Sequence, residues 1–422
     1  MREKNKVSDL NTTARAVLAL TANALFDARR PVPEEIDWQQ VYEECCHQAV
    51  PALGMRGAQA AGVPEDILQK WKQTVIASAY NNLRVSWEHN ELDRLMKSAE
   101  IPYVVLKGCA SALYYPDPSE RVMGDVDFLV RKEDMERAGK VLEQEGFVPW
   151  DEEHICHVVY RRPPTHYEMH FEPAGVPYGR AGELVREYMK NVMEQAHDVE
   201  YENGTITCPS VFHHGLIILL HTSHHLLGEG IGLRHLCDWA VFSASLSDEE
   251  FRRIFEEKFR AIGVWKFAGI LTRTAERWLG CPHREWPDAQ KTELEDAIIE
   301  DIFESGNFGQ KSEDRSYETY LISSRGKGGV GRTSMLRQMI LSLNEIIHMK
   351  WPVSKKLWIL LPFGWGYYGI RYLVKICRGQ RPALHPGKVI SGAAKRKEVY
   401  KEFGLFEGDE KQDYGILYKL RI

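Results

Sequence analysis

Hydrophobic residues recur at helical spacing over the first hundred residues of the chain. From residue 12 to about residue 98 the pattern predicts three or four helices, with turn signals at Pro31, Pro33 and Gly62-Val63-Pro64 between them. The last predicted helix is long, from about 65 to 100, and ends against Pro102. The chain therefore begins with a helical region.

The pattern then changes to short apolar runs that are typical of strands. Runs at 103–106 and 126–130 are followed by an amphipathic segment at 133–145, which Gly146 is placed to close as a helix. Two further β-like runs, 155–161 and 165–171, flank a pair of prolines. After Cys208 the pattern is helical again to about residue 304.

These segments predict an α+β protein in which a small core with a mixed sheet is embedded between mainly helical N- and C-terminal regions. The limits that we expect are 1–99 for the N-terminal helical region, 100–205 for the α/β core, 206–304 for a helical domain and 305–422 for a basic C-terminal region with an aromatic apolar segment.

Composition and charge add two points. The chain has 422 residues and is 44% hydrophobic, which excludes a wholly disordered or collagen-like protein, and its eight cysteines include no C-x-x-C pair, which favours a reducing cytoplasm. The net charge of -6 hides a strong polarity, because residues 321–401 hold sixteen Lys or Arg and only two Glu. That segment carries +14, and the rest of the chain carries −20.

The strand at 126–130 carries the first candidate site. Side chains alternate faces along a strand, so Asp125 and Asp127 should project to one side. Two close carboxylates repel each other, and a hard divalent cation with oxygen ligands is the natural compensator. Solvent-facing carboxylates on a strand are also common, so this pair alone does not decide the function.

A second polar pattern follows about forty residues later. Alternation places Glu168, His170 and Glu172 on one face of the 165–171 strand. If this strand lies beside the first, Glu168 becomes a third carboxylate near Asp125 and Asp127. Three such carboxylates can hold two metal ions, one for the attacking oxygen and one for the leaving phosphate.

A phosphate-binding element is expected upstream of the two aspartates. Lys107-Gly108-Cys109 follows the 103–106 strand and should open a helix, where free N–H groups favour a phosphate and Lys107 adds a positive charge.

In this order, Lys107-Gly108, Leu113-Tyr114-Tyr115-Pro116, Arg121-x-x-Gly124-Asp125-Val126-Asp127 and Glu168-x-His170 resemble the nucleotidyltransferase superfamily of the DNA polymerase β type. More narrowly, they resemble the bacterial uncharacterised nucleotidyltransferase family, and the likeness extends to Gly232-Leu233-Arg234-His235-Leu236-Cys237-Asp238-Trp239.

The resemblance implies a role for each matching residue. Asp125 and Asp127 would be catalytic ligands of two Mg²⁺ ions, Glu168 would complete the metal site or act as a base, and Gly108 would belong to the phosphate loop. Lys107, Arg121 and His170 would contact the nucleotide, although Arg121 could equally be a charge partner that keeps the two aspartates ionised. Cys109 departs from the superfamily, which has a small hydroxyl residue after the glycine.

The expected function is Mg²⁺-dependent transfer of a nucleoside monophosphate from an NTP to an acceptor hydroxyl on a small molecule, a protein or RNA. The substitution at Cys109 supports the alternative of a non-catalytic nucleotide-sensing or interaction module, peripheral to the membrane.

Histidines cluster between His213 and His235, and His214, His221 and His225 share one helical stripe. They could hold a transition metal, line an ordinary polar cleft, or roof the nucleotidyl site. Arg234 and Asp238 lie four residues apart on the next predicted helix and can form an ion pair; the alternative is a contact with the substrate.

Two features of the basic segment remain. Residues 326–333 mimic a phosphate-binding loop but lack the buried strand that should precede it, so we expect a flexible basic loop. Residues 357–370 are uncharged, rich in Trp and Tyr, and too broken for a transmembrane helix. We expect them to pack on the helical domain; the alternatives are that the segment at 321–401 contacts an anionic membrane or nucleic acid.

Overall fold

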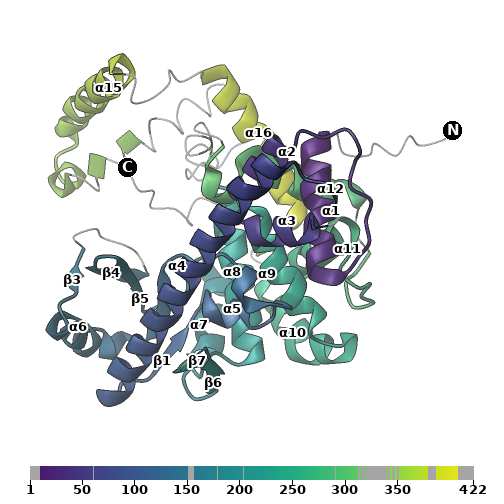
Figure 1. Cartoon of the computed structure of the whole chain (residues 1–422). Coiled ribbons are helices and arrows are strands. Elements are labelled where there is room, and N and C mark those ends of the chain that lie inside the picture. The colour runs from purple at the N-terminus through teal and green to yellow at the C-terminus, as the bar shows by residue number, and fades with distance from the viewer. Residues whose placement is uncertain are drawn as a thin grey trace.

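The computed structural model describes residues 10–378 and 386–406, except 60, 151–155, 178, 203, 290, 312–314, 316, 317, 319–339, 341, 342, 345, 346, 349 and 350. The loop at 326–333 therefore lies outside the described residues. Helices dominate, and they surround a small sheet (Figure 1). The α+β class and the embedding of the sheet between helical regions are confirmed.

The N-terminal helices form a layer against the helical body. They are α1 (Thr12–Phe26), α2 (Trp38–His47), α3 (Pro51–Gly57) and α4 (Glu65–Ser98). Most of α1 is buried because its Ala- and Leu-rich sequence lies between α3 and α11 (Trp265–Leu279). The long predicted helix is α4, which crosses the molecule diagonally in Figure 1.

The main sheet has five strands in the order β1-β2-β5-β4-β3. Their bounds are β1 Tyr103–Val105, β2 Val126–Val130, β3 Val148–Pro149, β4 His157–Arg162 and β5 Thr165–His170. Only the β2–β5 pair is parallel; the other neighbours are antiparallel, so the sheet is mixed as expected.

Helix α6 (Met135–Gln144) connects the second strand to the β3–β5 part of the sheet and packs its apolar stripe beneath it. Gly146 follows it with a φ of 85°, as the sequence predicted for its end. A separate hairpin, β6 (His197–Tyr201) with β7 (Gly204–Cys208), contacts β1 and α4.

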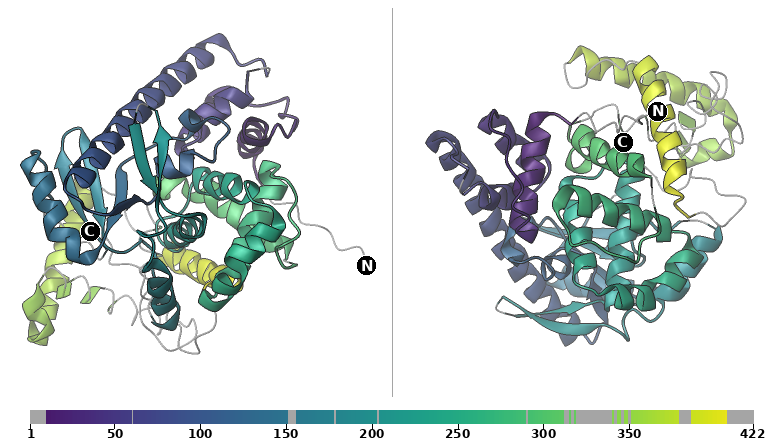
Figure 2. Two further views of the ribbon diagram at one scale, coloured as in Figure 1. Left: turned by 90° about the horizontal axis from the view of Figure 1, so that it is seen from below. Right: turned by 90° about the vertical axis from the view of Figure 1, so that its right-hand side faces the viewer.

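The second half of the described chain is helical. It contains α7 (Gly179–Met189), α8 (Val211–Leu227), α9 (Leu233–Ala244), α10 (Asp248–Ile262), α11, α12 (Thr292–Ser305), α15 (Leu361–Cys377) and α16 (Pro386–Phe403). Figure 2 shows α16 against the body, while α15 lies apart from it. Among the described residues, no helix is long and apolar enough to cross a membrane.

Helix α4 belongs to both hydrophobic cores. Trp71, near its start, is buried in the large core of the helical body, whereas Val85, Leu92 and Met96 are buried beneath the sheet. Because one continuous helix contributes to both cores, it fixes the sheet relative to the helices that face it.

Candidate active site

The parallel pairing of β2 with β5 brings the predicted carboxylates together. Asp127 lies directly opposite Glu168 in the register, and Asp125 immediately precedes β2. The condition set by the sequence, that the two polar strands be neighbours, is met. Donor atoms of Asp127, Glu168 and His170 all lie within 4.8 Å of one another.

Two basic side chains contact the buried Asp127, which is 5% exposed. The Nζ of Lys107 lies 3.1 Å from its Oδ1, and the Nε2 of His170 lies 3.3 Å from the same oxygen. His170 is also 3.6 Å from Oε2 of Glu168. These two side chains thus supply positive charge where a divalent cation would supply it.

The titration of these groups follows from the contacts. Burial alone would lower the pKa of His170, but hydrogen bonds to Asp127, Cys156 and Glu168 raise it well above its ordinary value. Burial would raise the pKa of Glu168, but the His170 hydrogen bond and the charge of Lys107 lower it. Glu168 is therefore ionised at neutral pH.

Asp125 behaves differently from its neighbours. Desolvation by the surrounding protein and repulsion from Glu168 and Asp127 raise its pKa. A group of carboxylates that repel one another in this way is typical of a cation site, and oxygen donors are the ligands that Mg²⁺ prefers. The carboxylates present are therefore of the kind that would hold Mg²⁺.

These residues line a cavity of about 610 Å³ between the sheet and the helical body. The sheet side contributes Asp125, Asp127 and Glu168, and the other side contributes residues of α8 and α9. Of the histidine stripe, His221 and His225 line the cavity, and His235 joins them there. His214 instead stacks on Tyr114, with ring centroids 5.1 Å apart.

The phosphate loop differs from the expectation. Gly108 adopts a φ of 64° and a ψ of −116°, which favour glycine, but the helix after it, α5 (Cys109–Ala112), has only four residues. So short a helix has little dipole for a phosphate. Cys109 is fully buried, with its Sγ 3.6 Å from Sδ of Met123. Ser111, in contrast, lines the cavity, and its buried hydroxyl has no hydrogen-bond partner among the described residues.

Arg121 is not the charge partner of the two aspartates. Its Nε and Nη2 each donate to a carboxylate oxygen of Asp238, at 2.8 Å, and Tyr115 donates to the same carboxylate. Asp238 is thereby committed to Arg121, and the expected Arg234–Asp238 pair is not found within 4 Å among the described residues. Arg121 occupies both carboxylate oxygens of Asp238, whereas Arg234 donates to the carbonyl of Val122 instead.

Sequence reasoning missed the residues that hold the loop before Asp125. Asn82 of α4 accepts from the Met123 N–H at 3.1 Å and donates to the carbonyls of Ser119 and Arg121, while Asn81 donates to the Met123 carbonyl. Adjacent asparagines in the middle of a helix are unfavourable for that helix, and this pair could have marked a polar role.

The geometry defines a mixed-sheet protein with a carboxylate-lined cavity suited to metal-assisted phosphate chemistry. Comparison with known families agrees: a family model described as "Uncharacterised nucleotidyltransferase" matches residues 34–280. The chain belongs to this family, which supports a role in nucleotidyl transfer in general. None of the curated proteins compared with the chain matches it.

Proposed function

We propose that this protein is a Mg²⁺-dependent nucleotidyltransferase of the DNA polymerase β type, which moves a nucleoside monophosphate from an NTP to an acceptor hydroxyl. The observation that carries the proposal is the parallel β2–β5 pairing, which sets Asp127 opposite Glu168 beside Asp125 in one cavity. Bound Mg²⁺ would polarise the phosphates and lower the pKa of the attacking hydroxyl.

The residues that line the cavity would have different roles in this reaction. Asp125, Asp127 and Glu168 would hold the cations, and a Glu168 with a lowered pKa would serve better as a ligand than as a base. Lys107, released from Asp127 when a cation binds there, can contact the triphosphate. The acceptor oxygen forms a bond to the α-phosphorus, the α–β phosphoanhydride bond breaks, pyrophosphate leaves and the hydroxyl proton passes to water.

The test is Mg²⁺-dependent NTP binding by calorimetry together with transfer of labelled NTP to cell-lysate fractions. Asp127→Ala should abolish NTP binding and transfer, because Asp127 is the carboxylate that lies opposite Glu168 and contacts both Lys107 and His170. Glu136→Gln, which alters an exposed carboxylate that pairs with Lys140, is the matched control and should behave as wild type. Turnover that survives Asp127→Ala would refute the assignment.

The second candidate function is a non-catalytic nucleotide-sensing module, and the burial of Cys109 against Met123 favours it because no hydroxyl follows Gly108. Ser111 opposes it, since it returns a hydroxyl to the cavity wall. NTP binding without pyrophosphate release, in the presence of every lysate fraction, would select this alternative.

A further inference from the structure

Arg234 is a partly buried cation in the cavity wall, and its Nε atom is out of contact with solvent. Its Nη1 donates to the carbonyl of Val122 at 3.0 Å, and its guanidinium lies 5.5 Å from the ring centroid of Phe308. Its Nε has no hydrogen-bond partner, and among the described residues no carboxylate lies within 4 Å of it. Asp238, the acid nearest in sequence, is bound to Arg121.

A guanidinium in this position is costly for the fold. It stays charged at any ordinary pH, and a charge removed from water needs an opposite charge or strong hydrogen bonds. Burial and the neighbouring Arg121 also lower the pKa of Arg234, which shows that its surroundings disfavour the charge. An anion bound in the cavity would supply the missing counter-charge.

His235 adds a donor beside it. The backbone N–H of Gly232 donates to Nδ1 of His235 at 3.3 Å, so the proton of the neutral ring must be on Nε2. That Nε2 is buried and has no hydrogen-bond partner within the described part of the chain; the residue is 2% exposed and lines the cavity. An Nε2–H group offers a hydrogen bond to an acceptor in the cavity.

The backbone N–H groups at the start of α9 are not available to bind an anion. The N–H of Leu233 donates to Oε1 of Gln48 at 2.9 Å, and the N–H of Arg234 donates to its backbone carbonyl at 3.3 Å. The helix terminus is thus already satisfied, and the unpaired donors are the side chains.

The neighbouring imidazoles allow a competing interpretation. Donor atoms of His221, His225 and His235 lie within 4.8 Å of one another and could in principle hold a metal ion. A protonated Nε2 on His235 cannot be a ligand, however, and the adjacent guanidinium would repel a cation. The wall therefore favours an anion.

We infer that Arg234 and His235 bind a phosphate group of the substrate, either a phosphate of the NTP or a phosphate carried by the acceptor. This rests on the proposed function only for the identity of the ligand. The phosphate would be held by a bidentate guanidinium contact and the Nε2–H hydrogen bond.

Calorimetry with metal-free inorganic tripolyphosphate, with orthophosphate and with Mg²⁺·NTP tests this. Arg234→Gln should weaken binding about 10- to 100-fold, the loss of a charge-assisted contact. Arg131→Gln, at an exposed arginine paired with Glu194, is the control and should bind as wild type. His235→Phe serves as a second variant should Arg234→Gln fail to fold, and it should weaken binding about 3- to 10-fold.

The three ligands distinguish the two possible sources of the phosphate, the NTP and the acceptor. Weaker tripolyphosphate and Mg²⁺·NTP binding assigns the subsite to the NTP, whereas weaker orthophosphate binding with unchanged Mg²⁺·NTP binding assigns it to the acceptor. Wild-type protein that binds none of the three, or variants that bind all three unchanged, would overturn the inference. Asp127→Ala should keep the metal-free tripolyphosphate binding, so a failure of the transferase proposal would be seen separately.

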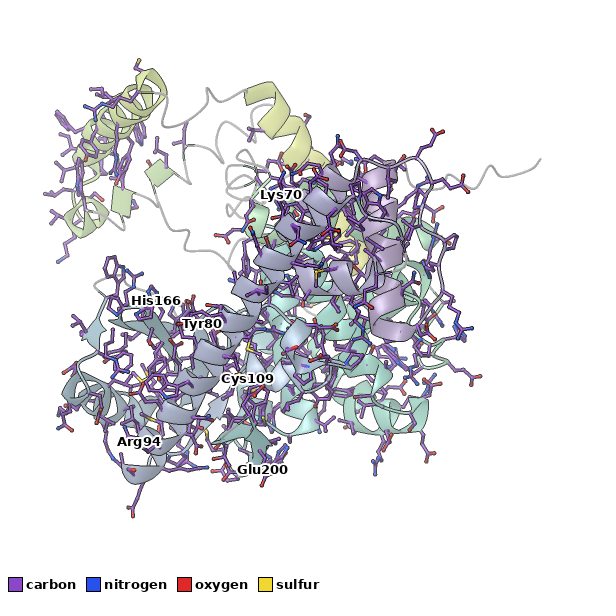
Figure 3. The ribbon with its side chains drawn as sticks, in the orientation of Figure 1. Lys70, Tyr80, Arg94, Cys109, His166 and Glu200 are labelled. Carbon is purple, nitrogen blue, oxygen red and sulfur yellow. The ribbon has the colours of Figure 1, made fainter. Side chains whose placement is uncertain are left out.

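A separate observation concerns α15. Phe363, Tyr367, Ile370 and Val374 follow one another at steps of four, three and four residues, so they form one stripe along the helix, here called the α15 stripe. Each is between 40% and 70% exposed. The expectation that this segment packs on the helical domain is therefore not met, and Figure 3 shows its side chains standing apart from the body.

The stripe is not the face by which α15 is held. Gly364 is buried against Ile347, and the indole N–H of Trp365 donates to Oδ1 of Asn344 at 2.8 Å. Just before the helix, Trp358 and Ile359 are also exposed.

Charge indicates the partner. Exposed Lys356, Arg371 and Arg378 flank the stripe, within the segment that carries +14. Apolar and aromatic side chains bordered by basic residues match the interface of an anionic bilayer, where the rings enter the headgroup layer and the cations meet lipid phosphates. We propose that the α15 stripe docks on an anionic lipid surface.

Vesicle flotation of the full chain tests this with phosphatidylcholine vesicles and with vesicles that also contain phosphatidylglycerol. The protein should float only with the anionic vesicles, and Phe363→Ser/Ile370→Ser should lower the floated fraction at least fivefold. The matched control is Ile76→Ser/Leu83→Ser, in an equally exposed apolar stripe on α4 around Tyr80 (Figure 3), which should float as wild type. No flotation of wild type, an unaffected α15 variant, or binding to RNA without flotation would overturn the proposal.

Discussion

The buried Arg121–Asp238 pair should be the polar contact on which the loop before the aspartates depends most. Arg121 is 5% exposed and donates twice to Asp238, and Tyr115 donates to the same carboxylate at 2.7 Å. Asp238→Asn removes the negative charge but leaves the guanidinium buried. Breaking one side of a buried pair costs about 3–5 kcal/mol of unfolding free energy.

Two further variants separate charge from shape. Tyr115→Phe removes one hydrogen bond to a charged acceptor and should cost about 2 kcal/mol. The double variant Arg121→Met/Asp238→Leu removes both charges together, and it is made in a Tyr115→Phe background so that no buried hydroxyl loses its acceptor. Because apolar residues of similar volume often replace a buried pair without loss, it should lie within about 1 kcal/mol of wild type.

Urea unfolding followed by both far-UV circular dichroism and tryptophan fluorescence measures these differences, and coincident transitions would justify a two-state fit. The double variant should recover stability because both charges are gone. It should not recover Mg²⁺·NTP affinity, because Arg121 lies four residues before Asp125, in the loop that leads to this aspartate. The reasoning fails if Asp238→Asn costs less than about 1 kcal/mol, or if the double variant is as unstable as the single one.

Three other perturbations have definite expected outcomes. Burial lowers the pKa of His89 and of His214 to about 3. Their neutral forms therefore stabilise the fold fully above the unfolded pKa of about 6.5. That stability is lost as the pH falls from there toward 3, by about 1.4 kcal/mol per pH unit for each residue. Between pH 7 and 4, the urea midpoint should change less steeply with pH for His214→Phe than for wild type. Gly108→Ala places a side chain at a φ of 64° and a ψ of −116°, a strain of about 1–3 kcal/mol that should appear in calorimetry as weaker Mg²⁺·NTP binding, and an unchanged affinity would contradict the role of this turn. Arg396→Ala removes donors to the carbonyls of Leu227 and Gly228 and should cost about 2–3 kcal/mol; hydrogen exchange should be faster in the last turn of α8, and equal protection there would argue against the capping role.

The sequence predicted the elements and the carboxylates because both depend on short-range patterns. Alternation placed Asp127 and Glu168 on the polar faces of two strands, and the structure pairs these strands in parallel. The limits of α4 and α6 were close because proline, glycine and apolar spacing act locally.

The partners of the buried charges could not be predicted in the same way. Arg121 and Asp238 are 117 positions apart, and Arg234, four residues from Asp238, was the nearer candidate by sequence. Which cation reaches the carboxylate depends on how the sheet sits against α9, and that is a property of the packed cores. For the same reason the role of Asn82 and the exposure of the α15 stripe were not visible in the pattern.

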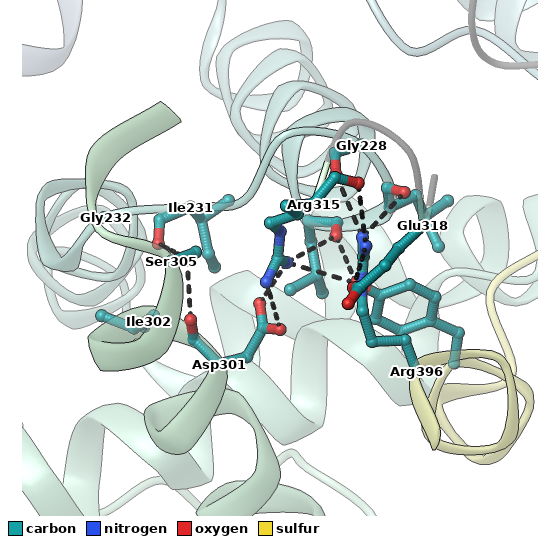
Figure 4. A network of polar contacts seen from close by, with 12 residues as sticks. Gly228, Ile231, Gly232, Asp301, Ile302, Ser305, Arg315, Glu318 and Arg396 are labelled. Carbon is teal, nitrogen blue, oxygen red and sulfur yellow. Dashed lines mark hydrogen bonds and ion pairs between the residues drawn. The ribbon is translucent and has the colours of Figure 1, made fainter. Parts of the chain in front are cut away.

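The C-terminal end of α8 is held by residues that are synthesised much later than α8 itself. Tyr400 donates to the carbonyl of Leu226 at 2.6 Å, and Arg396 donates to the carbonyls of Leu227 and Gly228; Figure 4 shows Arg396 there beside Arg315, which pairs with Asp301. These contacts join residues 168 to 174 positions apart.

At about 5–20 residues per second, a ribosome that has just made α8 needs roughly 10–30 s more to make its cap. During that interval the carbonyls of Leu227 and Gly228, at the end of the helix that carries His221 and His225, lack the Arg396 donors. The wall of the cavity is therefore finished late in synthesis, and a nascent chain that already displays all three carboxylates still lacks the contacts that set their opposite wall.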